Sequence, residues 1–349
     1  STSNWRPSIF TTHSDGTLGA PSSRPDDLIE AFDAEARRRE DRRDFFRNMM
    51  GAAAMTAAGA ASLSLATAAQ AQSTALSEVD VLNFALNLEY LEAQFYSYAA
   101  YGTGLPNNLL TGGVGTQGAV ITGTGAGSAR KVNFTDPLVA QYAREIASDE
   151  RAHVAFLRSA LGTAAVAQPA IDIGTAPNGA FSSAARAAGL VGPGQSFDPY
   201  ANDNNFLLAA YIFEDVGVTA YKGASPLITN KTFLEAAAGI LAAEAYHAGL
   251  VRTVLYRKGL QAPALIDASE AISNARDSLD GASDLDQGLR PRSTPFGEGS
   301  NIVPADSNAI AYSRSTGQVL NIAYLTAMST TGGGFFPNGV NGNIRMSAA

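Results

Sequence analysis

Two stretches of the sequence, ERAHVAFLRSAL (150–161) and EAYHAGLVRTVL (244–255), follow the same pattern, Glu-x2-His-x4-Arg-x2-Leu. The shared positions are Glu150 and Glu244, His153 and His247, Arg158 and Arg252, and Leu161 and Leu255. Because the chain has three histidines in all, two of them at matched positions indicate an internal repeat. A glutamate and a histidine three residues apart share one face of a helix, so each pair can be directed at one point.

A second pattern, Glu-x6-Tyr, precedes each of these stretches. It runs from Glu89 to Tyr96 and again from Glu214 to Tyr221. The order of the four segments indicates that a helical hairpin has been duplicated. The distance between the two glutamates is longer in the first copy, by about the length of the Gly/Thr-rich stretch 103–135, which predicts a surface loop added to that copy.

Apolar spacing and capping residues predict an all-α protein built on an antiparallel four-helix bundle over residues 77–258. The four long helices are predicted at 77–102, 136–161, 203–223 and 231–258. The connections 103–135 and 162–201 are rich in Gly and predict loop inserts. Short apolar runs in the first insert could pair as a hairpin.

Residues 259–349 predict an irregular C-terminal extension that packs on the bundle. Within it, short helices are expected at 266–279 and 307–327.

The matched residues predict a pair of metal ions in the middle of the bundle. Two Glu-x2-His pairs and one glutamate from each remaining helix form the ligand set of a carboxylate-bridged di-metal site. The predicted ligands are Glu89, Glu150, His153, Glu214, Glu244 and His247. Four buried carboxylates without cations would be strongly destabilising. The alternative is a bundle that has lost its metals and keeps these groups neutral or paired with arginine.

Five residues near the predicted ligands are candidates for supporting or catalytic roles. Glu92, one turn after Glu89, is a candidate extra ligand, although an exposed or ion-paired acid is the expectation we favour. Arg158 and Arg252 are expected to pair with carboxylates around the ligands. Tyr96 and Tyr221 are the candidate catalytic residues, as electron donors to the metals.

This set of motifs resembles the ferritin-like superfamily, in particular the ferritin-like domain family of bacterial proteins with twin-arginine leaders and of plant desiccation-related proteins. LNLEYLEAQFYSYA (86–99) is similar to the first ferritin helix, with Glu89 at the metal ligand and Tyr96 at the tyrosine near the centre. SDERAHVAFL (148–157) is similar to the second, with Glu150 and His153. His247 is closer to the pattern of bacterioferritins and manganese catalases. The inserts and the C-terminal extension would obstruct a 24-subunit cage.

The composition of the chain argues against nucleic acid as a partner and limits the types of metal ligand. A net charge of −8 and an isoelectric point near 5.0 argue against nucleic acid as a partner. The absence of cysteine excludes thiolate ligands, so any metal is held by carboxylate and imidazole. These ligands accept both iron and manganese, so the expected cofactor is two Fe or two Mn ions.

The N-terminal region predicts export. Residues 1–41 form a polar arm, and residues 42–72 resemble a twin-arginine leader, with Arg42 and Arg43 followed by an uncharged stretch from Met49 to Ala71. Cleavage after Ala71 would give a soluble periplasmic protein. Retention would anchor it in the inner membrane with its N-terminus in the cytoplasm. We favour retention because the small residues of 49–71 suit packing against other helices.

Two functions are compatible with these features. A loaded site predicts redox chemistry, either the oxidation of iron or the consumption of O2 or peroxide. A retained anchor predicts a structural subunit of a larger membrane complex, respiratory or photosynthetic, in which the bundle is a scaffold. Association into a homo-oligomer is a further alternative.

Overall fold

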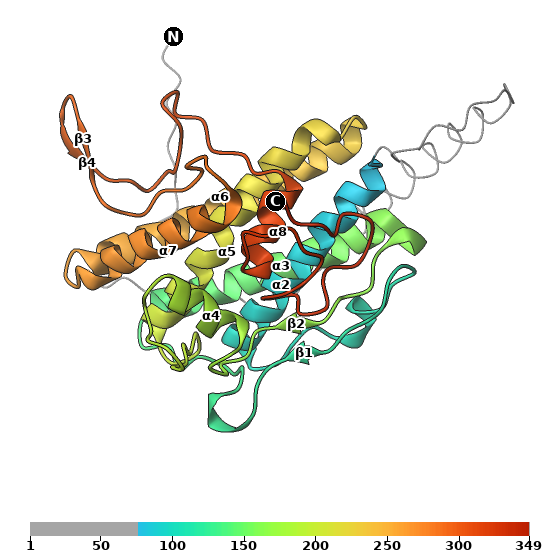
Figure 1. Ribbon diagram of the computed structural model, residues 1–349, viewed down its shortest axis with the longest axis horizontal. Helices are drawn as coiled ribbons and strands as arrows, with labels where there is room; N and C mark the ends of the chain where they lie inside the picture. The colour runs from blue at the N-terminus through green and yellow to red at the C-terminus, as the bar shows by residue number, and fades with distance from the viewer. Residues whose placement is uncertain (1–75, 349) are drawn as a thin grey trace, which may run out of the picture. The chain divides into compact units, whose positions relative to one another are not determined.

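The computed structural model describes residues 76–348, which form a mainly helical body (Figure 1). Four long helices make the bundle. They are α2 (Glu78–Tyr101), α3 (Pro137–Leu161), α5 (Asp203–Ala224) and α6 (Lys231–Gly259). Helix α2 packs along α3 and α5 along α6, so the two hairpins that the repeat predicted are both present.

Local sequence determines where these helices begin. Ser77 and Asp80 form a capping box at the start of α2. Asp136 caps α3 and precedes Pro137 at its first position, while Asn202 and Asn230 cap α5 and α6. Helix α2 ends at Gly102, whose φ of 80° is the left-handed conformation that glycine adopts without strain.

The inserts and the C-terminal extension cover the outer sides of α2 and α5. An aromatic cluster joins Phe95 of α2, Phe213 of α5, Phe181 of the second insert and Phe335 of the extension. The bundle covers one side of α2 and α5, and the inserts and the extension cover the other. Both helices are therefore buried along most of their length and carry apolar side chains on most faces.

Two asparagines of α2 fix the irregular segments to the bundle. Asn83 donates to the carbonyl of Ala164 and accepts from the backbone N–H of Val166. Asn87 exchanges two hydrogen bonds with the backbone of Asn341. Buried loop backbone thus finds partners without regular secondary structure.

The two inserts differ from the expectation of a hairpin in the first insert. Strand β1 (Val120–Ile121) pairs in parallel with β2 (Ile171–Asp172), so the inserts pair with each other. The second insert also contains a helix, α4 (Ala180–Ala187), which the Gly/Pro-rich composition concealed.

The extension contains α7 (Ala264–Asp280), close to its predicted range, a hairpin of β3 (Arg292–Thr294) with β4 (Gly297–Gly299), and α8 (Thr316–Tyr324). Helix α8 is shorter than the predicted 307–327. A turn in which Asp306 accepts from the N–H groups of Asn308 and Ile310 precedes it, and a capping box at Ser315 starts it late.

None of the helices within residues 76–348 is long and apolar enough to span a membrane. The predicted arm, leader and anchor, residues 1–72, lie outside the described residues.

Candidate metal centre

All six predicted ligands converge at the middle of the bundle. Each long helix contributes, so the duplication places two nearly equivalent sets side by side. Glu89 comes from α2, Glu150 and His153 from α3, Glu214 from α5, and Glu244 and His247 from α6. Five of them are at most 2% exposed, and His153 is half-buried.

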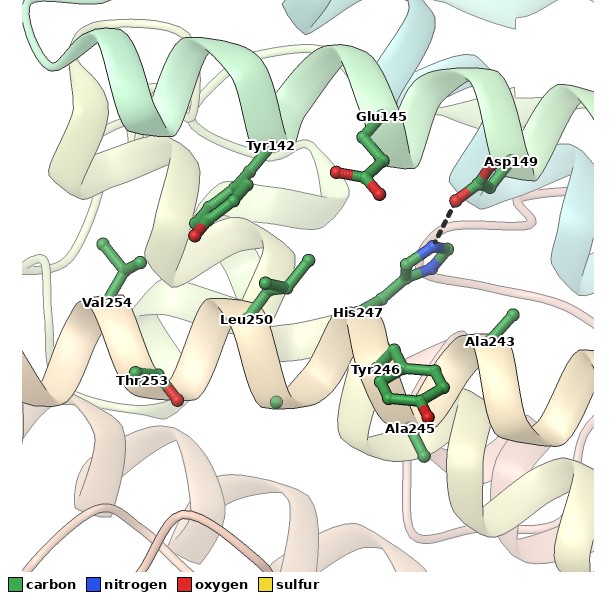
Figure 2. Close-up of a pocket in the computed structure, with 11 residues that line it drawn as sticks. Tyr142, Glu145, Asp149, Ala243, Ala245, Tyr246, His247, Leu250, Thr253 and Val254 are labelled. Carbon is green, nitrogen blue, oxygen red and sulfur yellow. Dashed lines mark hydrogen bonds and ion pairs between the residues drawn. The ribbon is translucent and has the colours of Figure 1, made fainter. Parts of the chain in front are cut away.

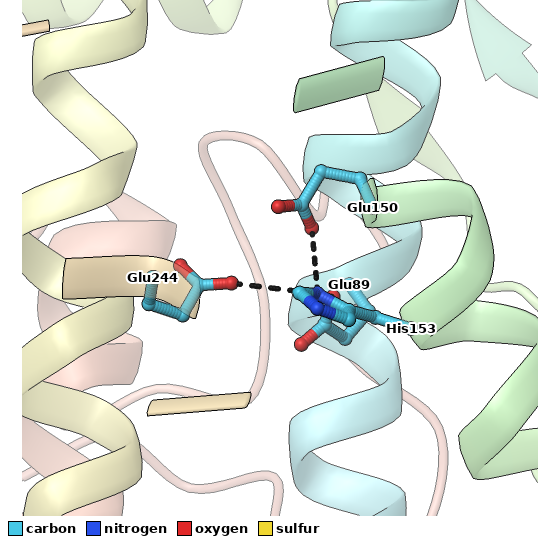
Figure 3. A group of neighbouring side chains, drawn as sticks. All are labelled: Glu89, Glu150, His153 and Glu244. Carbon is cyan, nitrogen blue, oxygen red and sulfur yellow. Dashed lines mark hydrogen bonds and ion pairs between the residues drawn. The ribbon is translucent and has the colours of Figure 1, made fainter. Parts of the chain in front are cut away.

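The first set, which we call the His153 group, consists of Glu89, Glu150, His153 and Glu244 (Figure 3). Nδ1 of His153 lies 3.1 Å from Oε2 of Glu89, 3.6 Å from Oε2 of Glu150 and 3.7 Å from Oε1 of Glu244. A single imidazole nitrogen thus faces carboxylate oxygens from three different helices.

The second set, the His247 group, consists of Glu150, Glu214 and His247. Nδ1 of His247 lies 3.0 Å from Oε1 of Glu150 and 3.6 Å from Oε2 of Glu214. Glu150 belongs to both groups and presents one oxygen to each histidine. This is the arrangement of a carboxylate that bridges two ions.

The donor atoms fit metal ions because many of them have no other partner. Both oxygens of Glu244 and Oε2 of Glu214 are buried without a hydrogen bond, and the buried oxygens of Glu150 have only the two histidines beside them. Each buried, unpaired carboxylate costs several kcal/mol, on the order of what breaking a buried ion pair costs. Two divalent cations would satisfy these atoms together. The residues present therefore fit a pair of iron or manganese ions.

The two tyrosines hold the remaining glutamates in a crossed arrangement. Tyr96 of α2 donates to Oε1 of Glu214 on α5, and Tyr221 of α5 donates to Oε1 of Glu89 on α2. Burial and the nearby carboxylates keep the pKa of each phenol well above its usual value. Both tyrosines thus remain protonated donors that orient the terminal carboxylates.

The electrostatics show a cluster that retains protons when no metal is bound. Burial raises the pKa of Glu89 to about 7 and that of Glu214 to about 8, although the histidines oppose the shift. Burial alone would lower the pKa of each histidine, but the carboxylates raise it to about 11 for His153 and about 10 for His247. Burial also acts on Glu150, yet the two histidines lower its pKa below the usual range.

The metal-free protein should lose stability as the pH rises from about 5 to about 8. Glu89 and Glu214 hold their protons more tightly in the folded chain than in the unfolded chain. Their contribution to stability is therefore complete below the unfolded pKa of 4.5 and is lost as the pH rises through their folded pKa values of about 7 and about 8. The histidines act in the same direction above 6.5. Melting temperatures measured with a chelator should fall across this range, and a constant or rising melting temperature would contradict the assignment.

Glu92 is not the exposed or ion-paired acid that we favoured. It is 7% exposed, forms no ion pair within residues 76–348, and lies with Glu214 and Glu244 in a third set of convergent carboxylates, the Glu92 group. Its Oε2 has no hydrogen bond. The middle of α2 is buried because other segments cover it, so an acid at position 92 cannot reach solvent.

Asp149 is a contributor that the sequence patterns missed. Its Oδ2 lies 3.1 Å from Nε2 of His247, on the side of the ring away from Glu150. A carboxylate in this place fixes the tautomer that leaves Nδ1 free to bind a metal. The sequence shows only that Asp149 directly precedes Glu150. It does not show the contact of Asp149 with His247, because His247 lies on another helix.

Of the two arginines expected to pair with carboxylates near the ligands, only Arg252 does so. Arg252 pairs with the carboxylate of Asp215 at 2.8 Å, next to Glu214. Arg158, its equivalent, pairs with no carboxylate of the described part of the chain and donates to the hydroxyl of Tyr90 and the carbonyl of Asn108. The repeat explains the difference, because Tyr90 and Asp215 occupy matched positions in the two copies.

A groove of about 500 Å³ runs between α3 and α6 and leads to His247 (Figure 2). Tyr142, Glu145 and Asp149 line it from α3, and Tyr246 and Leu250 from α6. Asp149 and His247 both line the groove and are joined by a hydrogen bond, so the predicted ligand His247 is reached from the α3/α6 side (Figure 2).

Comparisons with known proteins agree with this geometry. A family model described as a ferritin-like domain matches residues 77–257. The chain is 31% identical to a desiccation-related protein, PCC13-62, from Craterostigma plantagineum, over 76% of this chain and 83% of that protein. It is 30% identical to the ferritin-like catalase Nec2 from Nesocodon mauritianus, over 76% of this chain and 84% of that protein. No solved structure matches. The chain belongs to the ferritin-like domain family.

Proposed function

We propose that this chain is a di-metal redox protein that disproportionates hydrogen peroxide, converting two H2O2 into two H2O and one O2. The observation that carries the proposal is that Glu150 is shared by two histidine-containing ligand groups. Glu89, His153, Glu150 and Glu244 would hold one ion, and Glu214, His247 and the shared Glu150 would hold the other. A pair of manganese or iron ions supplies the two electrons that the two half-reactions exchange.

The residues of the chain supply binding, orientation and access. Tyr96 and Tyr221 hold Glu214 and Glu89 in fixed orientations, so these carboxylates need not reorganise during turnover. The groove between α3 and α6 admits a small neutral molecule to the His247 side. Apolar side chains around the rest of the centre exclude bulk water, since the bundle core surrounds it.

Two further observations favour peroxide as the substrate. The relative from Nesocodon mauritianus is named a catalase. Storage of oxidised iron needs an enclosed protein volume, whereas the groove that reaches His247 is open and has a volume of about 500 Å³. Oxidation of Fe²⁺ at the same two positions is the other outcome that an assay must distinguish.

The assay is oxygen evolution from H2O2 by the manganese-loaded and the iron-loaded protein, measured with an oxygen electrode. We expect one O2 for each two H2O2 consumed with at least one of the two metals. A chain with Glu150 and Glu244 both replaced by Gln should evolve none, because the shared ligand and a second ligand of the His153 group are gone. Consumption of O2 on addition of Fe²⁺, without evolution from peroxide, would replace this proposal by iron oxidation.

A further inference from the structure

A second hollow lies on the face of the bundle opposite the groove. Helix α2 packs against α3 and α5, and α6 packs against the same two helices, so the α2/α5 face is opposite the α3/α6 face. A cavity of about 30 Å³ lies on this α2/α5 face, with residues of α8 in its wall, and we call it the α8 cavity. It shares no lining residue with the groove that reaches His247.

The lining of the α8 cavity is almost entirely apolar. Within residues 76–348 it consists of nine apolar side chains, Gly217 and Glu92, contributed by α2, α5, α8 and the segment after α8. A buried water needs about three hydrogen bonds to polar groups, and Glu92 is the only polar side chain in this lining. The cavity therefore favours an apolar occupant over water.

The α8 cavity borders the candidate metal centre. Glu92 belongs both to its lining and to the Glu92 group with Glu214 and Glu244. Oε2 of Glu92 is buried without a hydrogen bond. At Gly217 the lining has no side chain, and a Cβ added there would overlap Oε2 of Glu244. The carboxylates of the centre are thus directly adjacent to the cavity.

Size and polarity select the kind of molecule that fits. A volume of about 30 Å³ is roughly two to three times what one water molecule requires, which is room for a diatomic molecule. H2O2 has two hydroxyl groups that need hydrogen-bond partners. The groove offers such partners through Tyr142, Glu145 and Asp149, and the cavity does not. O2 needs no hydrogen-bond partner, so the apolar lining suits it.

We propose that the α8 cavity is a binding site for O2 next to the metal centre. The inference rests on the proposed function, in which O2 is the product formed from two H2O2. The polar substrate then reaches the centre through the groove, and the apolar product is taken up on the opposite face of the bundle. Separate sites keep the product away from the side on which the substrate enters.

The test is methyl NMR of the metal-free full chain, with the δ1 methyl groups of its isoleucines labelled, under O2 and under N2 at the same pressure. O2 is paramagnetic, so it speeds the relaxation of nearby protons. Ile212 and Ile322 line the cavity, whereas Ile146 and Ile272 are buried elsewhere in the core. We expect O2 to increase the relaxation rates of the first pair more than those of the second.

Two variants reduce the cavity without changing a predicted metal ligand. Ala323→Val and Val319→Ile each enlarge a side chain that α8 contributes to its wall. Either change should remove the excess relaxation at the two isoleucines of the cavity. Ala243→Val is the matched control, because it makes the same kind of addition to the lining of the groove and should leave the excess unchanged.

Equal relaxation of all four isoleucines in the native chain would overturn the inference, and so would an excess that both α8 variants retain. The measurement needs neither metal nor peroxide, so its result is independent of catalysis. A loaded protein that evolves no O2 from H2O2, with the excess still present in the metal-free chain, would instead refute the proposed function and retain the apolar site.

Discussion

Replacement of both Glu150 and Glu244 by Gln should abolish metal binding at both positions and with it all metal-dependent stability. Each side chain contributes oxygens to more than one ligand group, so the two changes remove the bridge between the ions. The loss should exceed about 100-fold in affinity, since residues that only support ligands already account for about 10–100-fold. The measurement is the shift in melting temperature on addition of Mn²⁺ or Fe²⁺, which the native chain should show and the variant should not.

Without metal, Glu244→Gln alone should leave the chain at least as stable as the native one, because the two histidines favour the charge of Glu150 and not that of Glu244. Burial and the surrounding carboxylates raise the pKa of Glu244 well above its usual value, so this acid destabilises the empty site as the pH rises above that usual value. Glutamine has nearly the same volume and carries no charge. The matched control changes two exposed acids of the same helices, Glu145 and Glu235, to Gln and should keep the full metal-dependent shift. A variant that retains the shift would place the ions elsewhere.

Arg252→Met should destabilise the fold by about 3–5 kcal/mol, the cost of removing one partner from a buried ion pair. Arg252 is fully buried and pairs with Asp215. It also donates to backbone carbonyls of the extension, namely those of Gln287, Gly288, Asn301 and Ile302. Its removal takes a charged donor from all four carbonyls, of which Gln287 keeps the hydroxyl of Tyr211 and Gly288 the amide of Asn301 as partners.

The repeat provides the control for this change. Arg158→Met should cost less than about 1.5 kcal/mol, because Arg158 is half-buried and its hydrogen bonds go to one hydroxyl and one carbonyl. Free energies of unfolding from urea titrations of the two metal-free variants give the comparison. Equal losses in the free energy of unfolding at the two positions would mean that the buried ion pair and the carbonyl contacts of Arg252 add no stability beyond what Arg158 provides.

The four-helix core and the convergence of the six ligands could be predicted because both depend on local periodicity and on a duplication visible in the chain. Glu-x2-His places two side chains on one helix face whatever the surroundings are, and the second copy repeats the geometry. The caps at Ser77 and Asp136 likewise act within a few residues of the helix starts they fix.

The rest depends on contacts between segments far apart in the sequence. The burial of Glu92 follows from the covering of α2 and from the missing side chain at Gly217. The role of Asp149 depends on the packing of α3 against α6, which brings it to His247. The pairing of β1 with β2 depends on the contact between the two inserts. Arg158 and Arg252 share a motif, yet their partners differ because Tyr90 and Asp215 differ.

Metal content of the protein purified from its own host, measured by elemental mass spectrometry, tests the central claim most directly. The shared Glu150 and the two histidine-containing groups predict about two equivalents of manganese or iron per chain. Less than about 0.2 equivalents of any transition metal, in a chain that also binds none on titration, would contradict a di-metal centre and leave a bundle that holds its buried carboxylates by protonation alone.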